Sequence, residues 1–292
     1  MTPFSKHYKT GLLFIAPQLL ITIIFFIWPA FNAILQSLYY SDAFGLHHRF
    51  AALANFWDLF HRPEYGKAVL VTATLTLCIT CITLGFGLLL AVLINSLRRG
   101  KAVYKTLLLW PYAVAPAVAA ILWRFLCHPT LGWITQGLKY LGVDFNYLTN
   151  PVHALIVVIV TASWQQFSYN FLFYLAALSR VPKSILEAAV IDGATPQRCF
   201  WQIIFPLLSP TTFFLMIMNL IYAFFDTFGI IHVITNGGPQ YSTTTLVYKV
   251  YEDGFVGMDP GSSAAQSVML MIMVTVIMLV QFRFIEKKVH YT

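Results

Sequence analysis

The chain has 292 residues, of which 59% are hydrophobic, 16% are aromatic and only 10% are charged. Soluble proteins carry about 25% charged residues, so this composition excludes a water-soluble enzyme or binding domain. It also excludes a disordered chain, because disordered segments are poor in aromatic residues and rich in charge. The formal net charge of +7 is best explained by basic cytoplasmic loops of a membrane protein, so no nucleic-acid partner is expected.

Long charge-free runs predict six membrane-spanning helices. A span needs about 20 apolar residues, and a charge at the bilayer centre costs about 2.5 to 3.5 kcal/mol, so the spans lie between charged residues. Only a helix satisfies its own backbone groups within one such segment. We therefore expect an all-α polytopic membrane protein, a single transmembrane domain over residues 1–292. Its spans are expected at approximately 11–35, 69–95, 106–127, 153–178, 207–231 and 263–283.

The distribution of lysine and arginine predicts the orientation of these spans. Twelve of the 18 basic residues fall on one side, five fall on the other, and Arg124 lies at a helix end. The twelve are Lys6, Lys9, Arg98, Arg99, Lys101, Lys105, Arg180, Lys183, Arg198, Arg283, Lys287 and Lys288. The positive-inside rule then puts both termini in the cytoplasm. The first span is too long for a signal peptide and contains Pro17 and Pro29, so we expect it to remain as an anchor.

Cysteine and histidine give no sign of a catalytic or metal centre. Cys78 and Cys81 spell C-x-x-C, but inside an apolar helix, where they are expected to be small packing residues. The eight histidines show no metal-binding spacing, and His47, His48 and His61 share one external loop by chance. We expect no catalytic residue and no bound metal.

The cytoplasmic segment 179–206 joins the fourth and fifth spans and is the main polar element on its side of the membrane. Ser184 and Glu187 have the spacing of a capping box, which predicts a helix that starts there. Gly193 suits the end of that helix, and Thr195-Pro196 suits the start of a second one, which is expected to run to about Phe205. These signals leave two interpretations open: a surface on which another protein docks, or an ordinary connection with well-capped helices.

A family resemblance favours the docking surface. Glu187-Ala188-Ala189, Asp192-Gly193-Ala194, Phe200, Ile203 and Pro206 resemble the EAA loop of permease subunits of ATP-driven, binding-protein-dependent importers. Residue types and spacing match, with Phe205 in place of the usual leucine as a departure. The resemblance implies the type I ABC importer permease fold and a loop that couples to a cytoplasmic ATPase. The coupling residues would be Glu187, Ala188, Ala189, Asp192, Gly193, Ile203 and Pro206.

The same resemblance implies the other components of a transport complex. The chain has no G-x-x-x-x-G-K-[ST] segment, so ATP and its Mg²⁺ are expected on a partner ATPase and no cofactor on this chain. The implied partners are a second, homologous permease, two copies of the ATPase and a periplasmic or other external solute-binding protein. The implied location is the bacterial cytoplasmic (inner) membrane.

Further segments resemble the carbohydrate-type branch of these permeases, such as Thr235-Asn236-Gly237-Gly238-Pro239 followed by Thr243-Thr244-Thr245. Ala16-Pro17-Gln18, Ser168-Tyr169-Asn170-Phe171 and Ser262-Ser263-Ala264-Ala265 extend the likeness over nearly the whole chain. With them the chain most resembles the A-type permease subunits of sn-glycerol-3-phosphate importers. This resemblance implies transport of sn-glycerol-3-phosphate, with glycerophosphodiesters as further candidates. A maltose-type or other sugar permease fits the same motifs and stays an alternative. A secondary transporter would leave the loop unexplained, and a membrane enzyme would need a cluster of His, Asp or Glu that the sequence lacks.

Polar residues within the spans are the candidate substrate pathway. They are Gln165, Tyr169, Asn170, Asn219, Tyr222, Asp226 and Arg124. Such residues also bridge neighbouring helices, and an arginine at a helix end also reaches for the interface, so both alternatives stay open. On a straight helix at ~1.5 Å per residue, Asp226 would lie roughly 30 Å from Pro206, near the external interface. There it could serve as a gate or simply be solvated.

Overall fold

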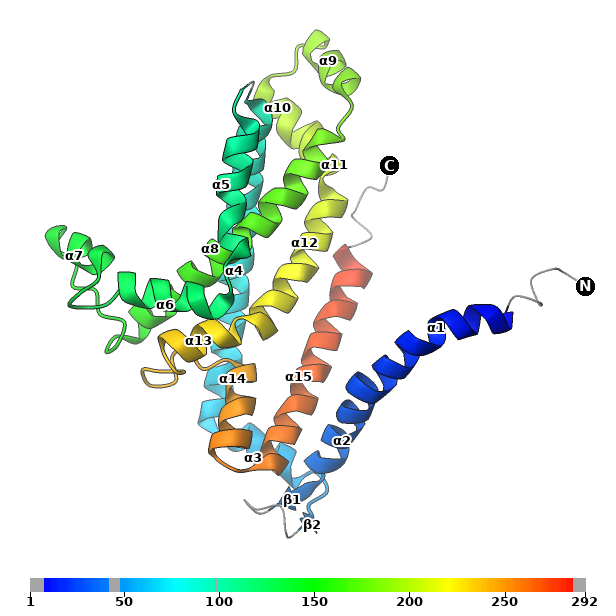
Figure 1. Cartoon of the computed structure of the whole chain (residues 1–292), viewed down its shortest axis with the longest axis vertical. Coiled ribbons are helices and arrows are strands. Elements are labelled where there is room, and N and C mark those ends of the chain that lie inside the picture. Colours follow the sequence, from blue (N-terminus) through cyan, green and yellow to red (C-terminus); the bar gives the residue numbers. More distant parts are fainter. Residues whose placement is uncertain (1–7, 42–47, 98, 286–292) are drawn as a thin grey trace, which may run out of the picture. The chain divides into compact units, whose positions relative to one another are not determined.

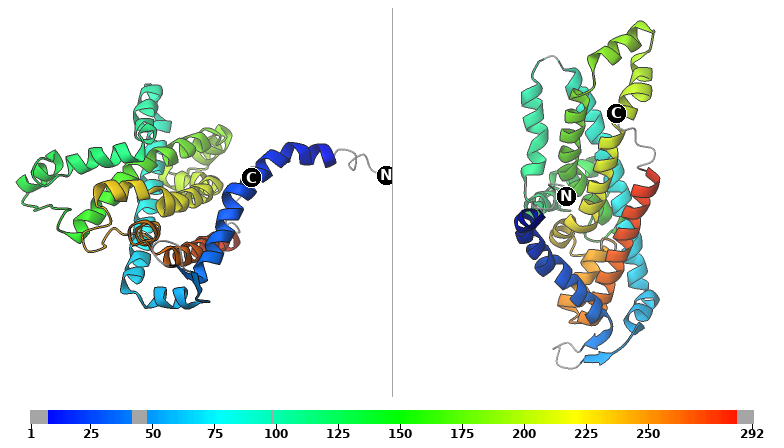
Figure 2. Two further views of the ribbon diagram at one scale, coloured as in Figure 1. Left: turned by 60° about the horizontal axis from the view of Figure 1, so that its bottom comes forward. Right: turned by 90° about the vertical axis from the view of Figure 1, so that its right-hand side faces the viewer.

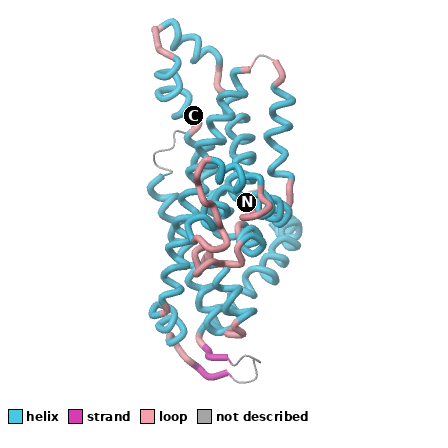
Figure 3. The backbone as a smooth tube through the Cα atoms, turned by 90° about the vertical axis from the view of Figure 1, so that its left-hand side faces the viewer, coloured by secondary structure: helices cyan, strands magenta, loops and turns pink. Residues whose placement is uncertain are grey.

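The computed structural model describes residues 8–41, 48–97 and 99–285, most of them helical (Figure 1). Among the residues named in the sequence analysis, Lys6, His47, Arg98, Lys287 and Lys288 lie outside the described part. The described chain divides into two compact units. One contains the residues up to Arg62 together with Lys249–Met273, and the other contains Pro63–Tyr248 and the residues from Val274 onward. Strands occur only in one short hairpin of the described residues (Figure 3).

The first unit begins with the first predicted span. Its elements are α1 (Tyr8–Thr22), a π-helical turn (Ile23–Ile27), α2 (Trp28–Ser37), the antiparallel strands β1 (Tyr39–Ser41) and β2 (His48–Phe50), and α3 (Ala54–His61). The π turn has a local cause: Pro29 has no N–H to donate to Phe25, and Trp28 instead donates to Ile23, five residues back. The helix continues through both prolines, and Leu13–Ser37 is apolar enough to cross a membrane.

An ion network holds the later part of this unit to α3. The chain returns through α14 (Leu246–Tyr251), a π turn (Glu252–Val256) and the start of α15 (Pro260–Val280). The Lys249 side chain is only 7% exposed, and its Nζ lies 2.8 Å from Asp253 and 3.7 Å from Glu252. Arg62 at the end of α3 lies 4.0 Å from Asp253 and 3.9 Å from Asp259. The carboxylates of Asp253 and Glu252 offset the free-energy cost of removing the Lys249 ammonium group from water.

The second unit holds the other helices. They are α4 (Pro63–Ser96), α5 (Lys101–Ala113), α6 (Pro116–Leu126), α7 (Trp133–Tyr140), α8 (Pro151–Ser179), α9 (Lys183–Ile191), α10 (Pro196–Cys199), α11 (Phe205–Leu207), α12 (Ser209–Ile221) and α13 (Phe228–Ile234). Helix α8 contacts α4, α5, α6, α12 and α13, so it forms the centre of this unit. Helices α4 and α8 lie side by side along much of their lengths (Figure 2).

The close approach of α4 to α8 depends on small residues. The buried residues of α4 recur every three or four positions, including Ala68, Thr72, Thr83, Gly87 and Ala91, and so form one narrow stripe. A Cβ atom on Gly87 would lie 2.8 Å from the Cβ of Asn170 and 3.0 Å from the backbone nitrogen of Phe171 in α8. Small residues of this kind let two membrane helices pack backbone to backbone.

Four of the described helices are long and apolar enough to cross a membrane, and the number rises to six if each of two bent helix pairs is counted as one span. Four are continuous: Leu13–Ser37, Pro63–Ser96, Pro151–Ser179 and Pro260–Arg283. The span expected at 106–127 consists of α5 and α6, which are bent by 96°, and the span expected at 207–231 is bent by 65° before Ser209. At the two bends, Pro116 and Pro210 each lie at the start of the following helix. A proline removes a helical donor and disfavours helical geometry in the residue before it.

The break between α5 and α6 is stabilised by one side chain. Val114 and Ala115 are extended, so the carbonyl of Val114 points away from any helical partner. The amide Nε2 of Gln165 in α8 donates to that carbonyl at 2.6 Å, and the Oε1 of Gln165 accepts from the Tyr222 hydroxyl at 3.4 Å. Backbone groups that leave a helix within a membrane need such a partner.

Replacing Gly87 with alanine is expected to destabilise the protein by about 1 to 3 kcal/mol, because α4 must move away from α8. Gly85→Ala is the matched control, since a Cβ atom there meets no atom within 4 Å. Thermal unfolding of the purified protein in one detergent measures both effects. A melting temperature lowered equally by the two substitutions would contradict the backbone-to-backbone packing.

Gln165→Leu is expected to cost about 1 to 3 kcal/mol, because it leaves the Val114 carbonyl without a partner in an apolar environment. Gln166→Leu changes the neighbouring amide, whose side chain makes no hydrogen bond among the described residues, and should leave the melting temperature nearly unchanged. Equal losses in the same unfolding assay would exclude a special role for Gln165 at the break.

Candidate functional site

The first candidate site is the loop that contains α9, which lies beyond the ends of α5, α8 and α12 (Figure 1). Helix α9 begins at Lys183 after the extended residue Pro182, and no side chain caps it. The expected capping box is therefore wrong. The fixed φ of Pro182 starts the helix earlier, so Ser184 already lies within the first turn rather than before it.

The end of α9 follows the sequence prediction. Gly193 has a φ of +78°, the left-handed conformation that glycine adopts most easily. Its N–H donates to Val190 at 3.0 Å, and the N–H of Ala194 donates to Ala189 at 2.9 Å. These two bonds form a Schellman motif, which fixes the direction in which the chain leaves the helix.

The second helix of the loop also starts as predicted. The Thr195 side chain accepts from the backbone N–H of Arg198 at 3.3 Å, and Pro196 is the first residue of α10. The helix continues through a π turn (Phe200–Ile204) into α11, which ends at Leu207, two residues beyond the predicted end. As at Pro29, the π turn stands directly before a proline, here Pro206, with Phe205 donating five residues back to Phe200.

The predicted coupling residues do not all face outward. Glu187, Ala188, Asp192 and Gly193 are exposed, whereas Ala189 is only 7% exposed and faces the inside of the loop. Ile203 and Pro206 are half-buried at the base. The structure therefore places Ala189 in the loop's own packing and leaves the other small and acidic residues on its surface.

Two apolar residues on α9 were missed by the sequence analysis. Val190 is 68% exposed and Ile191 is 85% exposed, next to Glu187 and Ala188 on the outer part of the helix. Their position directly after Ala189 in a polar loop was the available signal, since a solvated helix end normally carries polar side chains there. Exposed apolar residues flanked by acidic ones are typical of a surface that another protein covers.

The last segment of this loop is packed internally by aromatic rings and reaches the membrane helices through Ile204. The ring of Trp201 lies 5.1 Å from that of Phe200 and 5.2 Å from that of Phe205. Ile204 packs against the core cluster that contains Leu208 and Leu215. A displacement of α9 and α10 is therefore expected to pass into α12 through packed side chains rather than through a flexible linker.

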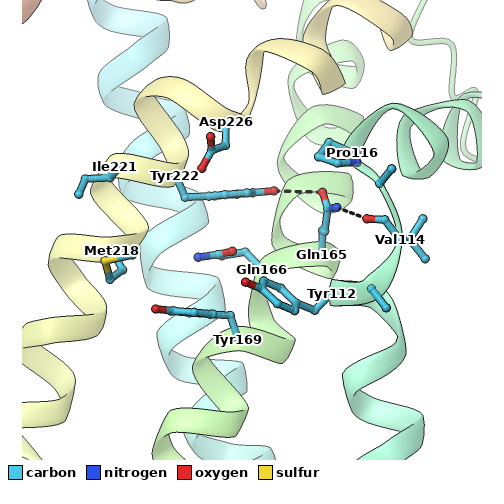
Figure 4. A pocket seen from close by; sticks show the side chains of 12 residues that line it. Tyr112, Val114, Pro116, Gln165, Gln166, Tyr169, Met218, Ile221, Tyr222 and Asp226 are labelled. Atoms are coloured by element: carbon cyan, nitrogen blue, oxygen red, sulfur yellow. Dashed lines mark hydrogen bonds between the residues drawn. The ribbon is translucent and has the colours of Figure 1, made fainter. Parts of the chain in front are cut away.

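The second candidate site is a cavity of about 470 Å³ between the α5–α6 break, α8 and α12 (Figure 4). Four of the predicted pathway residues line it: Gln165, Tyr169, Tyr222 and Asp226. Asp226 thus faces a cavity within the helices. Asp226 lies at the end of the helical segment Ser209–Asp226, in the π turn over Tyr222–Asp226, and its side chain also borders the cavity.

The other three predicted pathway residues do not line this cavity. Asn170 in α8 and Asn219 in α12 are fully buried and exchange two side-chain hydrogen bonds of 2.9 and 3.0 Å, and Thr83 of α4 donates to Asn219 at 3.3 Å. The two asparagines thus bridge neighbouring helices. Arg124 is exposed and donates to the carbonyl of Val233 at 3.0 Å.

Gln166 and Tyr112 also line the cavity and were missed. Gln166 is 6% exposed, and its amide points into the cavity (Figure 4). The rings of Tyr112 and Tyr169 lie 5.7 Å apart. The adjacent amides of Gln165 and Gln166 in an apolar span were a usable signal for Gln166. For Tyr112 the signal was its position beside Pro111, close to the break.

The chemistry of the cavity is that of a hydroxyl-binding site. The described residues that line it supply amides, phenol groups and one carboxylate, and none of them is basic. Amides and a carboxylate accept hydrogen bonds from hydroxyl groups, whereas a phosphate group prefers arginine, lysine or backbone N–H groups. Among the described residues no three His, Cys, Asp or Glu side chains form a group that could hold a metal ion.

Comparison with known proteins identifies the family. Residues 83–291 match the family described as "Binding-protein-dependent transport system inner membrane component". The chain is 52% identical over 279 residues to the sn-glycerol-3-phosphate transport system permease protein UgpA of Rhizobium meliloti, covering 96% of this chain and 95% of that protein. The protein of the same name from Brucella abortus is 51% identical over 278 residues, with 95% of each chain covered.

Solved structures agree on the fold. A bacterial ABC transporter involved in the import of the acidic polysaccharide alginate aligns with a TM-score of 0.83 at 21% identity, covering 97% of this chain and 98% of that one. The MetNI methionine ABC transporter aligns with a TM-score of 0.55 at 16% identity, covering 80% of this chain and 98% of that one. The sequence prediction of a type I ABC importer permease fold is confirmed. The chain belongs to the binding-protein-dependent transport system inner membrane components and is a multi-pass permease subunit of an ABC system, not its ATPase.

Proposed function

We propose that the chain forms part of the membrane path for sn-glycerol-3-phosphate in an ATP-driven importer. The observation that carries this proposal is the identity of 50–52% to three sn-glycerol-3-phosphate permeases, from Rhizobium meliloti, Brucella abortus and Yersinia pestis, over at least 95% of each chain. The likeness covers the helices that build the cavity as well as the coupling loop. Glycerophosphodiesters are further candidate substrates, because they carry the same glycerol hydroxyls.

The cavity supports a division of labour between this chain and a second permease. Asp226, Gln166 and Tyr169 can accept hydrogen bonds from the glycerol hydroxyls. Because the lining contains no cation, the phosphate group would be stabilised by the homologous permease that encloses the other half of the path. Asn170, Asn219 and Arg124 act as structural residues in this arrangement.

The loop around α9 would transmit the work of ATP. Two copies of a cytoplasmic ATPase subunit would each receive such a loop, and the exposed side chains of Glu187, Ala188, Asp192 and Ile191 would contact one of them. Closure of the ATPases would displace α9, and Ile204, which packs against Leu208 and Leu215, would carry the motion into α12. The helices would then open toward an external solute-binding protein that delivers the substrate.

The orientation follows from the same proposal. Contact of α9 with a cytoplasmic ATPase puts the loop between α8 and α12 inside the cell. Three spans then precede the fourth and two follow it, so both termini would be cytoplasmic, in agreement with the lysine and arginine distribution. The chain would act as a single permease domain, although it contains two compact units.

The substrate assignment is tested by reconstituting the complex with its binding protein and measuring ATPase activity. Glycerol-3-phosphate is expected to stimulate hydrolysis, glycerophosphodiesters are the second class to examine, and maltose-type oligosaccharides should have no effect. Stimulation by sugars alone would overturn the assignment. A binding protein without ligand is the control for basal hydrolysis.

The coupling surface is tested with Glu187→Lys and Gly193→Val in the assembled complex. The first reverses a charge on the exposed face, and the second forces a β-branched residue into a left-handed conformation that costs ~1–2 kcal/mol. A loss of ~1.4 kcal/mol of binding free energy at the contact corresponds to a factor of ten. Both substitutions should therefore lower substrate-stimulated ATPase activity and uptake at least tenfold.

Gly193→Asn is the matched control, because asparagine tolerates the left-handed conformation and should keep most of the activity. Wild-type activity in both Glu187→Lys and Gly193→Val would exclude the loop as the coupling surface.

Cavity residues should behave differently from loop residues: Gln166→Leu should change uptake without uncoupling ATP hydrolysis from the docked binding protein.

A further inference from the structure

A second groove lies at the end of the helices nearest α9, between the last turn of α4, the first turns of α5 and the end of α8. It has a volume of about 470 Å³, and its polar lining consists of Asn95, Lys101, Lys105 and Ser179. We propose that this groove binds the headgroup of an anionic phospholipid. The lipid is not a transported substrate but a bound component of the permease.

The charge of the groove supports an anionic ligand. Lys101 and Lys105 are four residues apart on α5, so their side chains extend from the same face of the helix. The described residues contain ion pairs at Arg62 and Lys249, but none at Lys101 or Lys105. The two ammonium groups are therefore not neutralised by a described acid.

The local geometry holds one of these cations in place. The Nζ of Lys101 donates to the carbonyl of Asn95 at 2.7 Å, across the turn between α4 and α5. An ammonium group has three protons, so two remain for phosphate oxygens. Lys101 is also the first residue of α5, a helix of 13 residues, and the positive end of its dipole lies beside the same groove. The hydroxyl of Ser179 on the opposite wall donates its proton to the carbonyl of Ala176 at 2.7 Å, so its oxygen can only accept a hydrogen bond from the headgroup.

The remaining walls distinguish a lipid from a free anion. Ile94, Leu172 and Leu175 form apolar walls of the groove. The neighbouring residues Leu93 and Val103 are 54% and 63% exposed, as is typical of helices that face lipid. The groove lies where the candidate spans Pro63–Ser96 and Pro151–Ser179 end, which is the depth of the phospholipid headgroups. A free phosphate ion would gain nothing from the apolar walls, whereas glycerol and acyl groups fit them.

Basic pockets between the ends of membrane helices are a recurrent site for anionic headgroups, and each lysine there strengthens binding by about fivefold. The double substitution of Lys101 and Lys105 by glutamine should therefore weaken binding about 25-fold. Because Ser179 ends α8 only a few residues before α9, an occupied groove would also hold the base of the α9 loop in place.

The test uses the assembled complex in membranes of phosphatidylcholine with or without phosphatidylglycerol, and it needs no transport substrate. Native mass spectrometry counts the phosphatidylglycerol molecules that stay bound to the permease. The wild-type complex should retain phosphatidylglycerol, the double glutamine variant should lose it, and the double arginine variant should retain it because the charge is preserved.

Lys67→Gln combined with Lys139→Gln is the matched control, since it removes the same charge from α4 and α7 outside the groove. This control should bind as much phosphatidylglycerol as the wild type. Equal retention by the glutamine variant and the wild type would overturn the proposal. Displacement of the lipid by inorganic phosphate would overturn the proposal in favour of a free-anion site. Loss of the ATPase subunit in the glutamine variant would overturn it in favour of a protein contact.

Discussion

Backbone hydrogen bonding without water is the constraint on which the rest of this structure depends. Each unpaired N–H or C=O group in hydrocarbon costs several kcal/mol, so the spans must be helical and every interruption needs a partner from elsewhere in the chain. The chain is interrupted within a span at the α5–α6 break, and there Gln165 reaches from α8 to the carbonyl of Val114 at 2.6 Å. A polar side chain in an apolar helix thus makes a sharp bend possible.

That bend also creates the cavity. Because α6 turns away by 96°, space opens beside α8 and α12, and the polar side chains Gln166, Tyr169 and Asp226 line it. The buried asparagine pair and the Gly87 contact hold α4, α8 and α12 together on the other side. The same helix α8 therefore carries a rigid, tightly packed face and a polar face toward the cavity, which suits a permease that must move as a body while it presents hydrogen-bonding groups to a substrate.

Prolines shape the loop that contains α9 as much as the spans. Pro29 and Pro206 each stand after a π turn, since the missing N–H shifts the preceding hydrogen bonds to a spacing of five residues. Local rules of this kind predicted the left-handed Gly193 and the Thr195 cap correctly, because both depend on residues next to each other in the chain. They failed for Ser184 because Pro182, two residues earlier, had already started the helix.

The sequence alone determined the properties that composition and local pattern control: the apolar segments that are long enough to cross a membrane, the helical turn at Gly193 and the family to which the chain belongs. The sequence also showed which polar residues lie in the spans. It could not distinguish residues that bridge two helices from residues that line a cavity, since both roles use the same side-chain types. Only the tertiary structure paired Asn170 with Asn219 and left Gln166 free to face the cavity. The physical reason is that the partner of a buried polar group lies far away in sequence, and the bends at the prolines decide which groups meet.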